Sequence, residues 1–299
     1  MAEGKMHADE VHTDASLVGR LLAAQFPRWA ALPIRPVLSA GTVNAMYRLG
    51  DDMVVRLPRI GRYLEDAEKE HRWLPRLAPH LPVAIPVPLA KGAPGEGYPF
   101  TWSVYRWLEG ENPAVDRLTN PSSLAADLAE FVTTMRNLDL ADAPPASFRG
   151  PLAVHDAGAR TAIEESRGMV DTDAVTAAWE AALRAPEWSG PPVWVHADLM
   201  PGNLLILEGR LAAVIDFSAV GVGDPACDLI VAWNLLPAGV RHKFRAAVRV
   251  DEATWARGRG MALLKALQAL PYYLHTNPAF AENARHVIGE VLADHRRAG

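Results

Sequence analysis

A short β-rich segment between residues 193 and 217 holds the side chains best suited to chemistry. Its pattern predicts a strand, a polar loop, a strand, a glycine-containing turn, a strand and a second acidic loop. If the last two strands pair around Gly209, Asn203 and Asp216 return side by side just outside the ends of the hairpin. Asp198 lies five positions upstream of Asn203 in the same loop. Three oxygen-bearing side chains are therefore expected at one sheet edge.

The types of these side chains indicate phosphate chemistry with a hard cation. A carboxylate and a carboxamide oxygen suit Mg²⁺, which keeps several waters and takes one or two protein ligands beside substrate phosphates. Asn203 and Asp216 are therefore the candidate metal ligands. The remaining carboxylate, Asp198, is left to interact with the attacking nucleophile. Asp198 is therefore the candidate catalytic residue.

The same loop matches the pattern H-R-D-L-x-x-x-N of the protein-kinase catalytic loop, with alanine in place of arginine. The matching residues are His196, Asp198, Leu199 and Asn203, and Ala197 stands in place of the arginine. Further along, residues 215–217 read I-D-F and residues 221–229 read G-V-G-D-P-A-C-D-L. As H-x-D-x-x-P-x-N, I-D-F and G-x-G-D-P-x-x-D-L, this series resembles the aminoglycoside phosphotransferase family, small-molecule relatives of protein kinases.

The resemblance runs from the first strands to the last helix and implies a bilobal, protein-kinase-like α+β fold. A small β-rich N-terminal lobe, residues 1–107, would bind the nucleotide. A larger helical C-terminal lobe, residues 108–299, would carry the catalytic loop and the acceptor site. By the same likeness Asp198 is the catalytic aspartate, Asn203 and Asp216 bind Mg²⁺, and ATP or GTP is the co-substrate. Phosphoryl transfer needs positioning and charge neutralisation more than a covalent nucleophile.

Other residues near the loop have structural interpretations. His196 closes a strand, and we expect it to hydrogen-bond the loop backbone, with proton transfer as the alternative that keeps it a candidate catalytic residue. Asp224 and Pro225 are typical of a helix N-cap followed by proline at the first helical position. Asp228 lies one turn further along the same face, and we expect Asp224 and Asp228 to support the catalytic loop.

In the first lobe, a kinase would show a glycine-rich loop, whereas residues 39–44 read S-A-G-T-V-N with one glycine. Hydroxyl and amide donors of Ser39, Thr42 or Asn44 are candidates for contact with phosphate. An ordinary hairpin turn is the alternative.

The third strand carries Arg56 where the kinase pattern has lysine. A guanidinium stays charged and its rigid fork suits phosphate, so nucleotide binding can survive this departure. The pattern E-x-x-x-L-x-x-L identifies Glu70 as the partner of Arg56 by resemblance. Glu65 and Glu68 are the alternatives.

The elements that must position these groups follow from periodicity. Five β-rich runs are predicted at residues 36–40, 43–49, 53–57, 83–89 and 100–107, and an amphipathic helix at 62–80. After residue 110 the pattern becomes helical, with predicted helices over residues 121–138, 155–184 and 237–296. Backbone groups near Arg106 and Leu108, where the fifth run leads into the second lobe, would meet the base of the nucleotide.

Composition limits the remaining classes of function. Thirty Lys and Arg against 35 Asp and Glu leave a net charge of −5, so no basic field favours nucleic acid or an anionic membrane. A single cysteine, Cys227, allows neither an intramolecular disulfide nor a cysteine zinc site. No apolar stretch reaches the ~18 residues of a membrane span. We expect a cytoplasmic monomer or homodimer.

Charge along the chain bears on the acceptor. Residues 151–236 hold 4 basic and 12 acidic side chains. The acidic members Glu164, Glu165, Asp171 and Asp173 would attract a cationic aminosugar, with a solvated helix face as the alternative. The leading hypothesis is γ-phosphate transfer to a hydroxyl of an aminoglycoside-like small molecule, which would inactivate an antibiotic.

Three other hypotheses stay open or are weaker. The same chemistry could act on a macrolide, a nucleoside antibiotic or a metabolite such as choline or an amino sugar, because residues 237–299 carry 10 basic and 5 acidic side chains. Arg56 and the single glycine also fit a catalytically silent kinase-like binding protein, which would not need Asp198, Asn203 and Asp216 together. A protein kinase is disfavoured because no activation segment is recognisable after Asp216.

Overall fold

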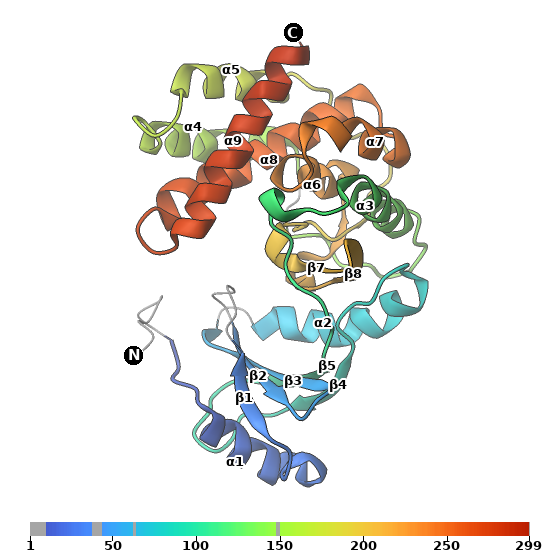
Figure 1. The fold of residues 1–299 in the computed structure, drawn as a ribbon, viewed down its shortest axis with the longest axis vertical. Coiled ribbons are helices and arrows are strands. Elements are labelled where there is room, and N and C mark those ends of the chain that lie inside the picture. Colours follow the sequence, from blue (N-terminus) through green and yellow to red (C-terminus); the bar gives the residue numbers. More distant parts are fainter. Residues whose placement is uncertain (1–9, 38–43, 62–63, 148–149, 299) are drawn as a thin grey trace. The chain divides into compact units, whose positions relative to one another are not determined.

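The computed structural model describes residues 10–37, 44–61, 64–147 and 150–298. They form two compact units, the first comprising Met1–Gly110 and Ala212–Ser218 and the second comprising Glu111–Leu211 and Ala219–Gly299. Figure 1 shows a β-rich first unit and a largely helical second unit. Within the described ranges, no helix has the length and apolar character needed to cross a membrane.

The first unit is built on a five-stranded antiparallel sheet in the order β1-β2-β3-β5-β4. Its strands are β1 (Ile34–Val37), β2 (Asn44–Leu49), β3 (Met53–Pro58), β4 (Pro88–Gly92) and β5 (Trp102–Arg106). Along β3, Val55 and Leu57 enter the core on one face of the sheet. Arg56 projects from the opposite face, because side chains alternate along a strand.

Helix α1 (Ala15–Gln25) covers the core face of this sheet, and the sequence analysis did not anticipate it. Asp14 caps its first turn by accepting a hydrogen bond from the Leu17 N–H group at 2.7 Å. The buried apolar residues of the helix recur at helical spacing and pack with Trp102 and Val104 of β5; they are Leu17, Val18, Leu21 and Leu22.

Helix α2 (Leu64–Leu77) packs on the other face. The Tyr105 hydroxyl on β5 donates to Glu70 of α2 at 2.8 Å, and His71 hydrogen-bonds Ser103 at 2.7 Å. The polar side of the sheet is thus tied to α2 by side chains of β5, while the apolar side packs on α1.

The predicted strand over 83–89 is wrong by several residues, because β4 begins only at Pro88. Pro86 and Pro88 have no N–H group to donate to a ladder, and β4 occupies the sheet edge where proline is tolerated. The first strand begins earlier than predicted, at Ile34, and residues 38–40 of that prediction lie outside the described residues.

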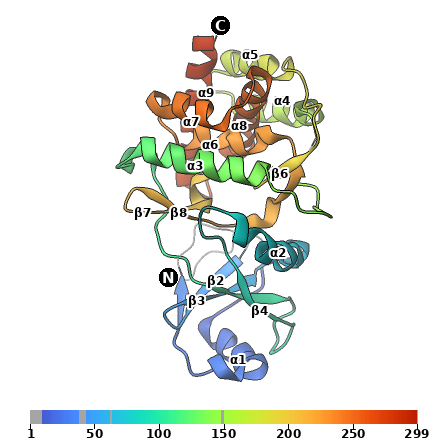
Figure 2. The same cartoon turned by 90° about the vertical axis from the view of Figure 1, so that its right-hand side faces the viewer.

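The second unit contains the remaining long helices, and Figure 2 shows several of them around α8. They are α3 (Pro121–Arg136), α4 (Asp156–Glu165), α5 (Thr172–Leu183), α6 (Val231–Asn234), α7 (Ala238–Val248), α8 (Glu252–Tyr273) and α9 (Pro278–Ala298). The helical stretch predicted over 155–184 comprises α4 and α5, separated by a turn in which Gly168 has φ +80°. Short 3-10 helices are η1 (Pro27–Trp29), η3 (Ala78–His80), η4 (Val115–Arg117), η5 (Leu152–His155), η6 (Pro201–Asn203), η7 (Phe217–Ala219) and η8 (Pro225–Ile230).

Two glycines let α8 approach its neighbours closely. A Cβ atom added at Gly258 would lie 2.7 Å from the Leu229 Cβ atom of η8. One added at Gly260 would lie 2.6 Å from the Ala182 Cβ atom of α5. Such distances are too short for real side chains, so larger residues at either position would push α8 away from η8 or α5.

Two small sheets complete the predicted β-rich segment. Strand β6 (Val193–Val195) pairs antiparallel with β9 (Gly221–Gly223). Strands β7 (Leu204–Leu207) and β8 (Arg210–Val214) form the second sheet. The two residues between them, Glu208 and Gly209, have φ +51° and +75°, as a two-residue hairpin turn of type I′ requires.

Asp127 on α3 anchors the start of β8. Its carboxylate accepts hydrogen bonds from Arg210 Nε at 2.7 Å, Arg210 Nη2 at 2.6 Å and the Leu211 N–H group at 3.1 Å. Burial favours the neutral acid, but these donors outweigh it and hold the pKa of Asp127 below its usual value.

We predict that Asp127→Asn lowers stability by roughly 1.5–3 kcal/mol at neutral pH, because it removes charge-assisted bonds. Glu130→Gln, an exposed carboxylate on the same helix, is the matched control. Since the folded pKa of Asp127 is depressed, its contribution is present above the unfolded value of about 3.9 and is lost as pH falls through the folded value. Urea unfolding at several pH values measures this; an unchanged gap between wild type and variant at acid pH would contradict it.

Candidate active site

The predicted catalytic loop, residues 196–203 after β6, is held in a strained backbone conformation. Ala197 has φ +65°, a left-handed value that a residue with a Cβ atom adopts only at an energetic cost. The N–H groups of His196 and Ala197 donate to the two carboxylate oxygens of Asp228, at 2.9 and 2.7 Å. A buried carboxylate therefore stabilises the conformation that presents the next residue, Asp198.

Asp228 is carried by η8, and Asp224 fixes the start of that helix. The Asp224 Oδ1 atom accepts the Ala226 N–H group at 2.9 Å, and Arg257 of α8 donates to Asp224 Oδ2 at 2.7 Å. Burial raises the pKa of Asp228, and the N–H groups it accepts oppose that rise. Both aspartates support the loop, as the sequence analysis expected.

Both carboxylate oxygens of Asp198 accept hydrogen bonds. Lys265 Nζ donates to Oδ1 at 2.7 Å, and Asn203 Nδ2 donates to Oδ2 at 2.9 Å. The side chain of Asp198 is 33% exposed, so one side of the carboxylate stays open to a reactant. Burial favours the neutral acid, but the Lys265 ammonium outweighs it and lowers the pKa of Asp198 below its usual value.

Lys265 is a partner of Asp198 that was not predicted from the sequence. It lies 67 positions after Asp198, so no local motif includes it. A signal was nevertheless present, because residues 261–270 read M-A-L-L-K-A-L-Q-A-L, a mainly apolar run with a single charged residue. A lone charge at such a position of a buried helix usually has a partner.

His196 faces its own loop. Its side chain is fully buried, and its Nδ1 atom accepts the Asp198 N–H group at 3.2 Å. Its ring lies edge-on to Phe131 of α3, with the ring centres 6.5 Å apart. This placement fits the expected hydrogen bond to the loop backbone better than transfer of a substrate proton.

A second cluster forms within the first unit around Arg56. Its Nη1 atom lies 2.6 Å from Glu70 Oε2, which gives the ion pair that the sequence analysis expected. Its Nη2 atom lies 3.8 Å from Asp216 Oδ1. Burial opposes the charged form of Arg56, but the carboxylates of Glu70 and Asp216 raise its pKa above the usual value.

Asn44 lies beside the same guanidinium. With its side-chain oxygen turned toward Arg56, that oxygen accepts from Nη2 and Nε at 2.9 Å each. Asn44 was predicted to contact phosphate, and here it orients Arg56. The other two residues predicted for that turn, Ser39 and Thr42, lie outside the described residues.

The two predicted hinge residues lie at the end of β5. Arg106 is the last residue of the strand and pairs with Met53 of β3, and Leu108 follows beyond the strand. The neighbouring Trp107 N–H group donates to the Asp52 carbonyl oxygen at 2.8 Å. Contact of these residues with a nucleotide base stays a prediction.

The residues predicted to bind Mg²⁺ have suitable donor atoms. Asn203 uses its Nδ2 atom for Asp198, which leaves its oxygen to serve as a ligand. Asp216 has φ +59° and a side chain that is 41% exposed, so its carboxylate is accessible. A carboxylate and a carboxamide oxygen fit a metal that also binds phosphates. The two residues belong to different units, and their convergence stays a prediction.

Comparison with known proteins decides the family. The model of the phosphotransferase enzyme family matches residues 35–262, which is most of the chain. The chain belongs to this family. Two aligned curated relatives are aminoglycoside 3'-phosphotransferase of Escherichia coli, 41% identical over 58 residues, and the uncharacterized protein YcbJ of Bacillus subtilis, 27% identical over 190 residues. These alignments cover 19% and 60% of this chain, and 21% and 58% of the relatives' own lengths.

Solved structures of other family members show the same fold. The GDP and kanamycin complex of APH(2")-IIia has a TM-score of 0.73 at 19% identity, covering 93% of this chain and 98% of that one. The macrolide 2'-phosphotransferase MphH of Brachybacterium faecium has a TM-score of 0.63 at 26% identity, covering 91% and 97%. The predicted α+β, kinase-like fold, with a smaller β-rich part and a larger helical part, is confirmed.

We predict that Arg56→Ala raises the nucleotide KM about 10- to 100-fold, because charge-assisted bonds to phosphate are lost. Arg56→Lys should keep part of the affinity, since it retains the charge but not the fork. Arg35→Ala, an exposed arginine on β1, is the matched control. Steady-state kinetics with ATP and GTP measure the effect; an unchanged KM in Arg56→Ala would assign phosphate binding to another residue.

Proposed function

We propose that this protein transfers the γ-phosphoryl group of ATP or GTP to a hydroxyl group of a small molecule. The main support for the proposal is the geometry of Asp198. Its ionised carboxylate is partly exposed, and its two oxygens are oriented by Lys265 and Asn203. Membership of the phosphotransferase enzyme family supports the reaction class.

In this mechanism the acceptor hydroxyl donates a hydrogen bond to Asp198, which turns the hydroxyl oxygen toward the γ-phosphorus. The low pKa of Asp198 keeps it ionised at physiological pH and makes it a weak base. A weak base suits a loose transition state, in which the hydroxyl proton leaves late and positioning contributes most of the rate. Asp198 then takes the proton and returns it to solvent.

The first unit would supply the charges for the nucleotide phosphates. Arg56 is held by Glu70 and Asp216 and would bind phosphate oxygens through its fork. Asn203 and Asp216 would hold Mg²⁺, which neutralises phosphate charge when bound. Similar structures described with GDP or ADP support a nucleotide co-substrate.

An aminoglycoside-like acceptor, and with it inactivation of an antibiotic, is the first candidate. The partial identity with an aminoglycoside 3'-phosphotransferase supports it. The acidic side chains of residues 164–173 support an aminoglycoside-like acceptor less strongly in the structure than in the sequence, because two of the four already have partners. Glu164 is paired with Arg167 at 2.6 Å, and Asp171 caps α5 by accepting the Ala174 N–H group. Glu165 and Asp173 remain exposed for attraction of a cation.

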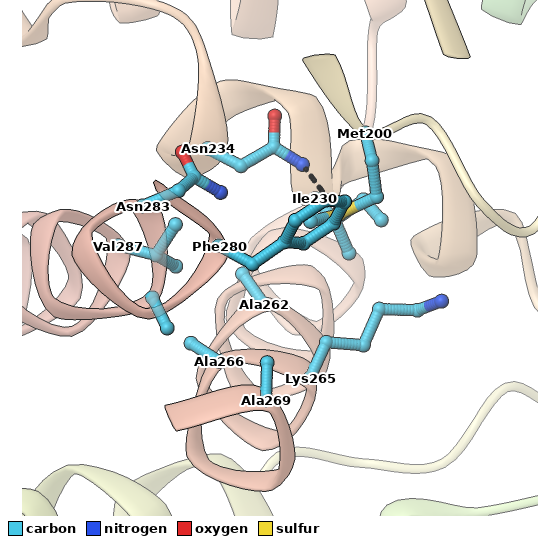
Figure 3. A pocket seen from close by; sticks show the side chains of 11 residues that line it. Met200, Ile230, Asn234, Ala262, Lys265, Ala266, Ala269, Phe280, Asn283 and Val287 are labelled. Atoms are coloured by element: carbon cyan, nitrogen blue, oxygen red, sulfur yellow. Dashed lines mark hydrogen bonds between the residues drawn. The ribbon is translucent and has the colours of Figure 1, made fainter. Parts of the chain in front are cut away.

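A macrolide acceptor is the second candidate, and a solved macrolide 2'-phosphotransferase among the similar structures supports it. A cavity of about 20 Å³ beside Lys265 has room for about one water molecule and does not distinguish the acceptors, although it is bounded mainly by apolar side chains, including Ile230 and Phe280 (Figure 3). Apart from Lys265, none of the described residues that line it is charged. The 26% identity with a macrolide 2'-phosphotransferase agrees with this choice. The silent-binder hypothesis has less support, because Asp198 and Arg56 both keep oriented partners.

We predict that the wild-type protein consumes ATP or GTP with at least one acceptor of a panel comprising kanamycin, gentamicin, erythromycin, uridine, choline and glucosamine. Asp198→Asn should lower kcat by roughly 10²–10⁴-fold, as loss of a proton acceptor does, with nucleotide binding retained. A coupled assay for the nucleoside diphosphate and mass spectrometry of the acceptor measure this. Asp139→Asn, an exposed aspartate after α3, is the control. Wild-type kcat in Asp198→Asn would remove the catalytic assignment.

A further inference from the structure

The position of Lys265 follows from the packing of α8 against η8. Gly258 brings α8 against Leu229, next to the residue that holds the catalytic loop. Seven residues later, about two helical turns, Lys265 lies on the same face of α8. The close approach at Gly258 therefore aims Lys265 at the catalytic loop, and its ammonium reaches Asp198 at 2.7 Å.

The surroundings of Lys265 leave its charge directed at the catalytic residue. Its side chain is 22% exposed, and its stem borders the apolar cavity with Ala262, Ala266 and Ala269. Figure 3 shows the ammonium end leading away from the apolar ring of Phe280. A structural lysine could have remained in solvent, because its long stem readily reaches water. Here it is bonded to the carboxylate that must meet the acceptor.

We propose that Lys265 is a catalytic residue that binds Asp198 before the reaction and pairs with the phosphoryl group as that group arrives on the acceptor. The inference rests on the proposed phosphotransfer and adds a residue of α8 to it. It uses only groups of the second unit, Asp198, Asn203 and Lys265.

Distance supports this role. An acceptor hydroxyl bonded to Asp198 would lie about 2.7 Å from a carboxylate oxygen. If it shares Oδ1 with Lys265, the ammonium and the hydroxyl oxygen are at most about 5.4 Å apart. The oxygens of the incoming phosphoryl group project beyond the hydroxyl oxygen, and the flexible lysine stem can turn toward them. Lys265 therefore needs only a small rotation to exchange one anion for the other.

The negative charges that come together in the transition state give the reason for a cationic side chain at this position. During the step a lone pair of the acceptor oxygen forms the new bond to the γ-phosphorus, and the bond from phosphorus to the β,γ-bridging oxygen breaks. The bonding electrons leave with the nucleoside diphosphate, and the hydroxyl proton passes to Asp198. Because the proton leaves late, the phosphoryl group arrives while Asp198 is still a carboxylate, and the two anions repel each other. An ammonium within reach of both lowers that repulsion in the transition state.

The first experiment tests the pair without turnover. The carboxyl ¹³C resonance of Asp198, assigned with Asp198→Asn, is titrated in wild type and in Lys265→Met. Loss of the ammonium should raise the pKa of Asp198, and Lys265→Arg should keep it low. An unchanged pKa in Lys265→Met would show that the pair is absent in solution and would overturn the proposal.

The second experiment tests the phosphoryl contact with ATP and GTP, using kanamycin, erythromycin and water as acceptors. Lys265→Met should lower kcat by about 10²-fold, with nucleotide KM unchanged and partial recovery in Lys265→Arg. The phosphorylated product should also inhibit about tenfold more weakly, while the acceptor KM stays the same. Lys265→Gln repeats the test if the methionine variant does not fold. Lys243→Met, an exposed lysine on α7, is the control.

The outcomes separate this inference from the proposed function. If wild type transfers phosphate to no acceptor, including water, the proposed function fails and the role of Lys265 fails with it. If the wild-type protein turns over and Lys265→Met keeps full activity, only the proposed role of Lys265 is contradicted. A lower kcat with unchanged product inhibition would make Lys265 a positioning residue for Asp198 and would also overturn the phosphoryl contact.

Discussion

The carboxylate of Asp228, buried in η8, accepts the N–H groups of His196 and Ala197, and this interaction holds the loop that carries Asp198. Without it, the left-handed backbone at Ala197 would relax, and Asp198 would lose its orientation. The ion pair between Asp224 and Arg257 then ties η8 to α8. One helix therefore both supports the catalytic loop and carries a side chain that contacts it.

Charge is arranged in the same way in both units, with a functional group held by an opposite charge. In the first unit Glu70 holds Arg56, and in the second Lys265 holds Asp198. Each pair orients its members before substrates bind, so less reorganisation would be needed during the proposed reaction. In each pair one member is partly exposed, with Arg56 at 17% and Asp198 at 33%.

The parts of the site that lie close together in sequence were predictable, and the parts that depend on tertiary packing were not. The spacing of His196, Asp198 and Asn203 identified the loop because local motifs preserve local geometry. Lys265 could not be assigned, since only the close approach of α8 to η8 at Gly258 brings it to the loop. Helix α1 was missed because its short apolar stripe gains stability from the sheet it covers rather than from its own sequence.

In the proposed mechanism, Asp198 directs an acceptor hydroxyl onto the γ-phosphorus in one direct displacement. The most direct test uses ATP or GTP made chiral at the γ-phosphorus with sulfur and oxygen isotopes, together with an acceptor that the wild-type protein phosphorylates. A single in-line transfer predicts inversion of configuration at phosphorus in the product. Retention would require two successive displacements through a phosphorylated side chain, and it would contradict a mechanism in which Asp198 acts without becoming a covalent nucleophile.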